Sequence, residues 1–345
     1  MWNHIPIDKE KGGARRDPLF WKNMSGKAGK MKDCSYYIDR AVRRTEAELG
    51  CSVGGPAEII PSMAKEDYPI NYILDVSYGN KTEAEKADIY LPEEIKDKMP
   101  CLIEVHGGGW YFGRKSSVEF KPFLYGLKRG YILISAGYTL SPEATYPAAV
   151  EEIKGLIRFL RAHADEYHID GKRIALWGGS AGAQLAGLAA MDAERRFDSP
   201  DFGNIEQDSG VNACVLWYGC YNYDMDAGQR RKLHMPLREG DYWTYRNYLG
   251  CDELNSCREV LHEMNPENHI SLGAPPVFLQ HGDKDTYVPY LQSVDFYEKL
   301  VKVVGSEKVT LEILSGYEHA DDRMFEEANV RKVFDFLDRI NGRIE

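Results

Sequence analysis

Short runs of apolar residues alternate with longer amphipathic stretches over most of the chain, beginning near Tyr72. The short runs are rich in β-branched side chains and predict strands, whereas the longer stretches repeat their apolar positions at helical spacing. The predicted strands cover residues 73–77, 87–91, 101–106, 131–136, 173–177, 213–217, 277–281 and 309–314. The predicted helices cover residues 118–129, 148–164, 181–192, 291–304 and 322–339.

Strands that alternate with helices and are apolar almost throughout are typical of a parallel sheet covered on both faces. We therefore expect an α/β fold with a mostly parallel, eight-stranded sheet flanked by helices. No helix is predicted between the first two strands, so we expect an antiparallel edge there.

Two parts of the chain depart from this alternation. Residues 1–68 are rich in Lys, Arg and Glu and predict a peripheral N-terminal extension, which is a candidate part of a lid, ahead of one domain over residues 69–345. Residues 218–272 separate two predicted strands by more than an ordinary connection needs, and they are dense in Tyr and Trp. This second part predicts a helical insertion, either as a lid or substrate wall or as a small unit with its own core.

Composition narrows the class of protein. The chain has 345 residues, of which 43% are hydrophobic and 28% charged, as in ordinary globular proteins. Its net charge of −11 argues against nucleic acid or an anionic membrane as a partner, since both favour a basic face. A homo-oligomer is compatible with the sequence.

Neither a signal peptide nor a membrane span is visible in the sequence. The seven cysteines show no C-x-x-C spacing, so we expect no metal site and interpret them as free thiols, several of them buried. Together these features predict a cytoplasmic protein, because reducing compartments keep thiols free.

Ser180 is the first candidate for chemistry. It lies between Gly178 and Gly182, directly after a predicted strand and before a predicted helix. Glycines at these two positions allow a sharp turn that lifts the serine hydroxyl clear of the sheet, as in a G-x-S-x-G nucleophile elbow.

A glycine-rich loop follows the strand at 101–106. His106 precedes Gly107, Gly108 and Gly109, and Trp110 follows them. Consecutive glycines indicate close approach by the backbone. We predict that the amides of Gly108, Gly109 and Ala181 form an oxyanion hole.

The remaining candidates follow the last two strands. Asp283 and Asp285 come after the strand at 277–281, and we favour Asp285 because Asp283 follows a glycine and suits the turn itself. His319 comes after the final strand. The order Ser180, Asp285, His319 is that of a serine–acid–histidine triad, with His319 as general base.

These motifs resemble α/β-hydrolases of the esterase/lipase group that have an HGGG-type oxyanion loop, which includes hormone-sensitive-lipase-like enzymes. The matching segments are residues 106–110, 138–152, 178–182, 281–289 and 316–320. Hormone-sensitive-lipase-like members usually carry Asp before the serine, whereas this chain has Gly179. Residues 177–186 and 281–289 are more similar to bacterial carboxylesterases, which include acetylxylan and feruloyl esterase-like enzymes.

The motifs and the resemblance together predict a serine carboxylesterase that needs no cofactor and acts on a small-molecule ester. We expect short, acetyl-like acyl groups, with a sugar or aryl leaving group among the candidates and Trp110 and Tyr218 in the substrate pocket. Three alternatives stay open: an arylformamidase, a prolyl-oligopeptidase-like peptidase on the same fold, and a non-catalytic binding protein.

Overall fold

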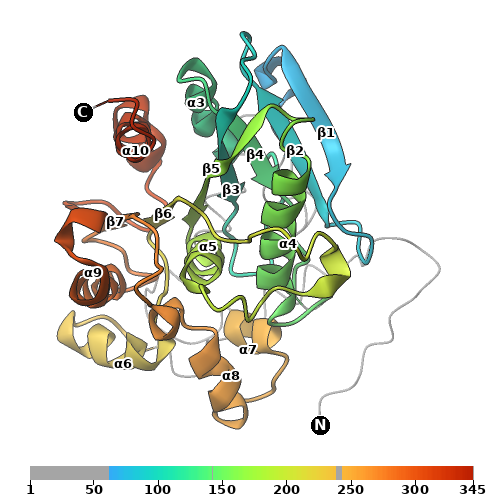
Figure 1. Ribbon diagram of the computed structural model, residues 1–345. Helices are drawn as coiled ribbons and strands as arrows, with labels where there is room; N and C mark the ends of the chain where they lie inside the picture. Colours follow the sequence, from blue (N-terminus) through green and yellow to red (C-terminus); the bar gives the residue numbers. More distant parts are fainter. Residues whose placement is uncertain (1–61, 142, 238–242, 345) are drawn as a thin grey trace. The chain divides into compact units, whose positions relative to one another are not determined.

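The computed structural model describes residues 62–141, 143–237 and 243–344 (Figure 1). The predicted N-terminal extension, residues 1–68, therefore lies almost wholly outside the described residues.

A single eight-stranded sheet runs through the domain, in the order β1-β2-β4-β3-β5-β6-β7-β8. Strands β3 to β8 pair parallel with one another, whereas β2 pairs antiparallel with both β1 and β4. The predicted mostly parallel sheet and its antiparallel edge are confirmed. The strands are β1 (Asn71–Ser77), β2 (Lys86–Leu91), β3 (Met99–Val105), β4 (Ile132–Ala136), β5 (Ile169–Gly179), β6 (Ala213–Trp217), β7 (Val277–Gly282) and β8 (Val309–Leu314).

Helices cover both faces of this sheet (Figure 1). The α-helices are α3 (Tyr125–Lys128), α4 (Ala148–Ala162), α5 (Ala181–Met191), α6 (Tyr223–Lys232), α7 (Trp243–Leu249), α8 (Arg258–Glu263), α9 (Leu291–Val304) and α10 (Glu327–Ile340). The 3₁₀ helices are η2 (Lys65–Asp67), η3 (Val118–Leu124), η4 (Pro200–Phe202), η5 (Leu254–Cys257), η6 (Pro266–His269), η7 (Ser306–Lys308) and η8 (Asp322–Phe325).

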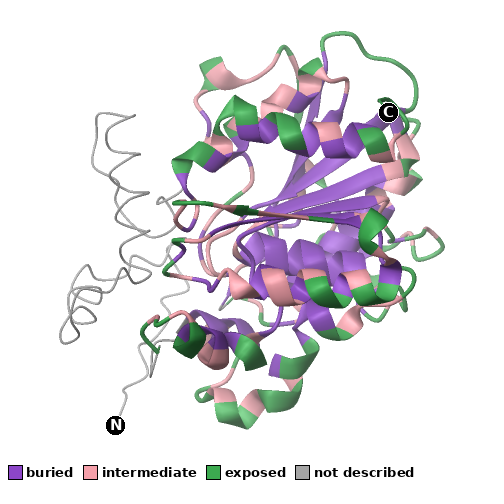
Figure 2. Ribbon diagram, turned by 90° about the vertical axis from the view of Figure 1, so that its left-hand side faces the viewer, coloured by how far each residue is buried: buried purple, intermediate pink, exposed green. Residues whose placement is uncertain are grey.

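The central strands are buried on both faces, which explains their continuous apolar sequence. Every residue of β3, β4, β6 and β7 is buried, whereas edge strand β1 is mostly exposed (Figure 2). Successive side chains of a strand point to opposite faces. Thus Ile103 of β3 belongs to the apolar cluster beneath α4, α5 and α9, while its neighbour Leu102 belongs to the cluster beneath η3 and α10. Each fully buried aliphatic side chain of this kind contributes about 1.5–3 kcal/mol to folding.

Two predicted helices are broken in the structure. The segment 118–129 forms η3 followed by α3, with Pro122 inside the 3₁₀ segment. Proline lacks the backbone N–H that an α-helix needs, so the first turns take the tighter form. The segment 322–339 likewise begins as η8 and continues as α10.

The chain between β6 and β7 contains α6, α7 and α8 (Figure 1). Apart from Tyr218, its buried apolar side chains join the same cluster as the sheet and α9, rather than forming a separate core; they include Tyr221, Tyr248, Leu261 and Met264. Tyr221 stacks on Phe296 of α9, with ring centroids 4.6 Å apart. These helices therefore pack as an extension of the domain's core.

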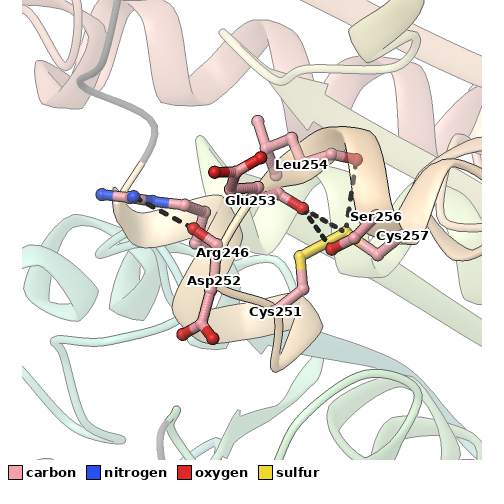
Figure 3. The surroundings of a disulfide bond; sticks show 7 residues. All are labelled: Arg246, Cys251, Asp252, Glu253, Leu254, Ser256 and Cys257. Carbon is pink, nitrogen blue, oxygen red and sulfur yellow. Dashed lines mark hydrogen bonds between the residues drawn. A yellow bond between two sulfur atoms is a disulfide. The ribbon is translucent and has the colours of Figure 1, made fainter.

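The expectation of free thiols is wrong for one pair of cysteines. Cys251 and Cys257 form a disulfide across the turn between α7 and η5 (Figure 3). A spacing of six residues is no recognised motif, and it is the turn after α7 that brings the two sulfur atoms together. Cys101, Cys214 and Cys220 are buried and free, as expected, while Cys34 and Cys51 lie outside the described residues.

Within the described residues, no helix is both long and apolar enough to cross a membrane.

Candidate active site

Ser180 occupies a sharp turn between β5 and α5. Its backbone has φ 54° and ψ −121°, a combination that L-residues rarely adopt. A side chain at Gly178 would overlap the Gly182 carbonyl, and one at Gly182 would overlap the Val105 carbonyl. Both flanking glycines are therefore needed for strand and helix to pack, which is the geometry expected of a nucleophile elbow.

The structure brings Ser180, His319 and Asp285 together. The Nε2 atom of His319 lies 3.0 Å from Ser180 Oγ, and its Nδ1 lies 2.6 Å from Asp285 Oδ2. The three residues follow β5, β8 and β7, whose carboxyl ends meet at one edge of the sheet because these strands are parallel. Asp285 and His319 are buried.

Asp283, the competing carboxylate, holds the turn instead. Its Oδ1 accepts a hydrogen bond of 2.7 Å from the Gly316 amide, on the loop that leads to His319. The Lys284 amide donates to the Tyr317 carbonyl over 2.9 Å, and a side chain at Gly282 would overlap that same carbonyl. The acid loop and the histidine loop are thus clamped together through their backbones.

Asp285 is ionised despite its burial. Burial by itself raises the pKa of this carboxyl, but the facing His319, together with hydrogen bonds from His281 and His319, outweighs it and holds the pKa below its usual range. An ionised carboxylate at this place can orient the His319 imidazole and stabilise the imidazolium.

The glycine loop lies directly against Ser180. A Cβ atom on Gly107 would come within 2.8 Å of the Gly179 carbonyl oxygen and 3.4 Å of Ser180 Cβ. Gly108 and Gly109 have φ values of 115° and 60°, which favour glycine. Among the described residues, none accepts a hydrogen bond from the amides of Gly108, Gly109 or the helix-initiating Ala181. These N–H groups are available to an incoming oxygen atom.

His106 packs against this loop. Its Nδ1 lies 2.8 Å from the Gly107 carbonyl oxygen, and its ring stacks on Tyr138 with centroids 4.2 Å apart. The Tyr138 hydroxyl in turn donates to the His106 carbonyl over 2.9 Å. Burial lowers the pKa of His106 to about 4, so its imidazole is neutral near pH 7.

Trp110, predicted to lie in the substrate pocket, packs between structural elements. Its indole N–H donates to Gln184 Oε1 on α5 over 2.9 Å, and its ring stacks on Tyr248 of α7 at 4.7 Å. Only 4% of the residue is exposed. Trp110 therefore joins the glycine loop to α5 and to the insertion.

Tyr218, the other predicted pocket residue, lies beside the nucleophile. Its ring meets the His319 ring edge to face, with centroids 4.8 Å apart. A Cβ on Gly179 would lie 2.7 Å from the Tyr218 hydroxyl oxygen, so this tyrosine occupies the space of a side chain before the serine. The Tyr218 backbone has φ 41°, which is strained for a non-glycine residue.

Arg230 supports the acid loop, and the sequence patterns did not reveal it. This side chain of α6 is buried, pairs with Asp226 over 2.7 Å and donates to the Tyr287 carbonyl over 2.6 Å. The spacing of Asp226 and Arg230 by four residues on one helix was the available signal, but it does not identify the loop that the pair supports.

No group of three or more His, Cys, Asp or Glu side chains is arranged to hold a metal ion in the described ranges.

Comparison with known proteins bears on this geometry. A model of the BD-FAE family matches residues 87–300. The chain is 30% identical to the probable carboxylic ester hydrolase LipM of Mycobacterium tuberculosis, over 72% of this chain and 56% of that protein. It is 31% identical to esterase LipQ of the same organism, over 78% of this chain and 62% of LipQ. The chain thus spans little more than half the length of these relatives.

Solved structures give the same picture of the fold. A truncated carbohydrate esterase from gut microbiota superposes with a TM-score of 0.65 and 23% identity, covering 81% of this chain and 99% of that one. Propionate-bound esterase 2 of Thermogutta terrifontis superposes with a TM-score of 0.61 and 23% identity, covering 78% of this chain and 94% of that one. This likeness, with the sheet order above, establishes the α/β-hydrolase fold.

Proposed function

The chain belongs to the BD-FAE family, and from this premise we propose that it is a serine carboxylic ester hydrolase that works through an acyl-enzyme on Ser180. The hydrogen-bonded series Ser180–His319–Asp285 at the elbow carries the proposal. Relatives named as carboxylic ester hydrolases and esterases support it.

In the first step, His319 Nε2 accepts the proton of Ser180 as Oγ attacks the ester carbonyl carbon. Asp285 keeps the other ring nitrogen protonated and so fixes the tautomer in which Nε2 is the base. The imidazolium then protonates the departing alkoxide. Water attacks the acyl-enzyme with His319 again acting as base, which releases the acid and restores Ser180.

The negative charge that develops on the carbonyl oxygen needs donors already in place. The amides of Gly108, Gly109 and Ala181 supply them in this proposal, since none has another acceptor among the described residues. Each such donor is worth roughly 2.7–4 kcal/mol of transition-state stabilisation. No cofactor takes part in these steps.

We propose esters of short acyl groups as the substrate class. A sugar is compatible with this class as the alcohol part of the ester. Tyr218 supports this choice, because it fills the space beside Gly179 and its ring packs against His319. Structures of Thermogutta terrifontis esterase 2 bound to propionate and to butyrate, and the gut carbohydrate esterase, support this class.

A cytoplasmic location stays a prediction. The buried free thiols of Cys101, Cys214 and Cys220 support it, whereas the Cys251–Cys257 disulfide is typical of an oxidising compartment. Thiol labelling of protein taken rapidly from the native cell distinguishes a reducing from an oxidising location. Labelling of Cys251 and Cys257 would support the cytoplasm.

Hydrolysis of p-nitrophenyl acetate and labelling by a fluorophosphonate test the proposed function. We expect the wild-type protein to do both, and Ser180→Ala to lose labelling and at least about three orders of magnitude in kcat/KM. Ser117→Ala, at the buried serine that precedes η3, is the matched control and should keep both activities. A folded wild-type protein that neither reacts with the probe nor hydrolyses the ester would overturn the proposal.

A further inference from the structure

A second histidine contacts the carboxylate of Asp285. The Nε2 atom of His281 lies 3.0 Å from Asp285 Oδ2, the same oxygen that accepts the 2.6 Å hydrogen bond from His319. The other carboxylate oxygen, Oδ1, accepts bonds of 2.7 Å from the backbone amides of Tyr287 and Val288. Two imidazoles thus share one oxygen of this carboxylate, and only one of them reaches Ser180.

The surroundings of His281 determine which of its nitrogens carries a proton. Nε2 faces Asp285 Oδ2 and, at 3.1 Å, the Val288 carbonyl, both of which only accept hydrogen bonds. Nε2 must therefore carry the hydrogen. Nδ1 lies 2.8 Å from the hydroxyl of Ser293 on α9, which can donate to it. His281 and Ser293 are both fully buried, so these contacts stand in place of hydrogen bonds to water.

We infer that His281 is a positioning residue, which fixes the Asp285 carboxylate toward His319. The inference rests on the proposed ester hydrolysis. The series then runs Ser293–His281–Asp285–His319–Ser180, and it ties α9 and the end of β7 to the elbow.

The chemical consequence concerns the charge that Asp285 presents to His319. A carboxylate oxygen that already accepts one hydrogen bond attracts a second donor less strongly, so the His281 bond moderates the attraction. Removing the His281 donor concentrates the negative charge on His319 and strengthens the attraction of the carboxylate for the imidazolium form. The carboxylate also loses one of its fixed contacts.

Two phenols near this series stay neutral over the range of interest. Tyr218 approaches Asp285 from the end of β6, and Tyr221 lies near Ser293. Burial raises the pKa of both phenols well above neutral pH, so neither ionises in a titration between pH 5 and 9.

The test compares His281→Leu, which removes the donor, with His281→Gln, whose amide nitrogen can reach the same oxygen. For His281→Leu we expect kcat for p-nitrophenyl acetate to fall about tenfold or more, with KM little changed and the acid limb of kcat/KM moved up by about half a pH unit or more. His281→Gln should recover part of kcat and most of the shift. His163→Gln, at the distant C-terminus of α4, is the control for loss of an imidazole.

A double-mutant cycle separates positioning from packing. If His281 acts through Asp285, His281→Leu should cost less than about twofold in an Asp285→Asn background, because the group it positions is already altered. An equal loss in both backgrounds, together with an unmoved acid limb, would mean that His281 only fills space and would overturn the inference.

Two further measurements cover the remaining outcomes. If His281→Leu fails to fold, Ser293→Ala serves instead, since it removes the hydroxyl that holds the tautomer and should move the same limb by less. If the wild-type protein shows no hydrolysis, the proposed function fails, but the NMR titration of the His319 ring in wild type and His281→Leu still decides the inference. An unchanged titration of His319 would refute it.

Discussion

The elbow around Ser180 and the helical insertion at residues 218–272 position the candidate catalytic groups by different physical means. At the elbow, the absence of side chains at Gly178 and Gly182 lets strand, helix and glycine loop approach until their backbones touch. In the insertion, large side chains reach across to other elements. Trp110 stacks on Tyr248 of α7, and Arg230 of α6 donates to the acid loop.

The difference shows why one region has a sequence signature and the other has none. Only glycine allows so close an approach of two backbone segments, so the sequence shows glycine at fixed positions. A long side chain that braces a loop can come from many positions and be replaced by other combinations of residues. The insertion therefore also contacts the loops of the candidate site, but these contacts could not be recognised without the fold.

The largest expected effect separates the two carboxylates of the acid loop. Asp285→Asn should lower kcat by about four orders of magnitude, because the imidazole loses the partner that fixes its tautomer. Asp283→Asn should cost much less, since Asp283 holds only the turn through the Gly316 amide. The rate of p-nitrophenyl acetate hydrolysis by both folded variants measures this, and similar losses would mean that the loop, rather than one residue, matters.

A pair of glycines tests the elbow against the insertion directly. Gly182→Ala places a methyl group into the Val105 carbonyl, and we expect at least about a hundredfold loss of activity with a lower melting temperature. Gly228→Ala is the counterpart inside α6, where nothing lies within 4 Å of the new Cβ. That change should stabilise the protein by about 0.5–1 kcal/mol and leave activity intact. Thermal unfolding and activity assays would contradict the comparison if Gly182→Ala were tolerated.

A third variant asks how much the insertion supports the acid loop. Arg230→Met removes the buried ion pair with Asp226 and the hydrogen bond to the Tyr287 carbonyl, which we expect to cost about 3–5 kcal/mol of unfolding free energy. Activity should fall about tenfold, since the Asp285 loop loses a brace. Arg231→Met, at an exposed position of the same helix, is the matched control. Urea unfolding of both variants measures how much the contacts of Arg230 contribute to the unfolding free energy.

The smallest effect concerns pH and compares two histidines. The folded pKa of His106, about 4, lies below the unfolded value near 6.5, so the unfolded state binds its proton first as pH falls. The contribution of His106 to the unfolding free energy is thus fully present above pH 6.5. It declines as the pH drops toward 4, by at most about 3 kcal/mol. His106→Asn should flatten this part of the pH–stability curve. His262→Asn, at an exposed site of α8, should not, and equal curves for all three proteins would rule out His106 as the cause.

Much of the fold and site was accessible from the sequence alone. The strands appear as apolar runs because the sheet is buried on both faces. Asp285 was separable from Asp283 because a carboxylate directly after a strand-end glycine suits the turn. The prediction of free thiols failed for Cys251 and Cys257, which are only six residues apart, because the path of the turn that joins their sulfur atoms has no mark in the residue types. The contact between His281 and Asp285 was likewise not recognised from the sequence, although four residues separate the two.

The sequence by itself determined the alternation of strands and helices, the glycine turns and the order of Ser180, Asp285 and His319, because local backbone geometry and periodic burial leave marks at fixed spacings. Only the tertiary structure decided that Tyr218 fills the space before the serine, that Arg230 supports the acid loop and that two imidazoles share one carboxylate oxygen. Those relations depend on which elements become neighbours, and a side chain's partners across space have no fixed separation along the chain.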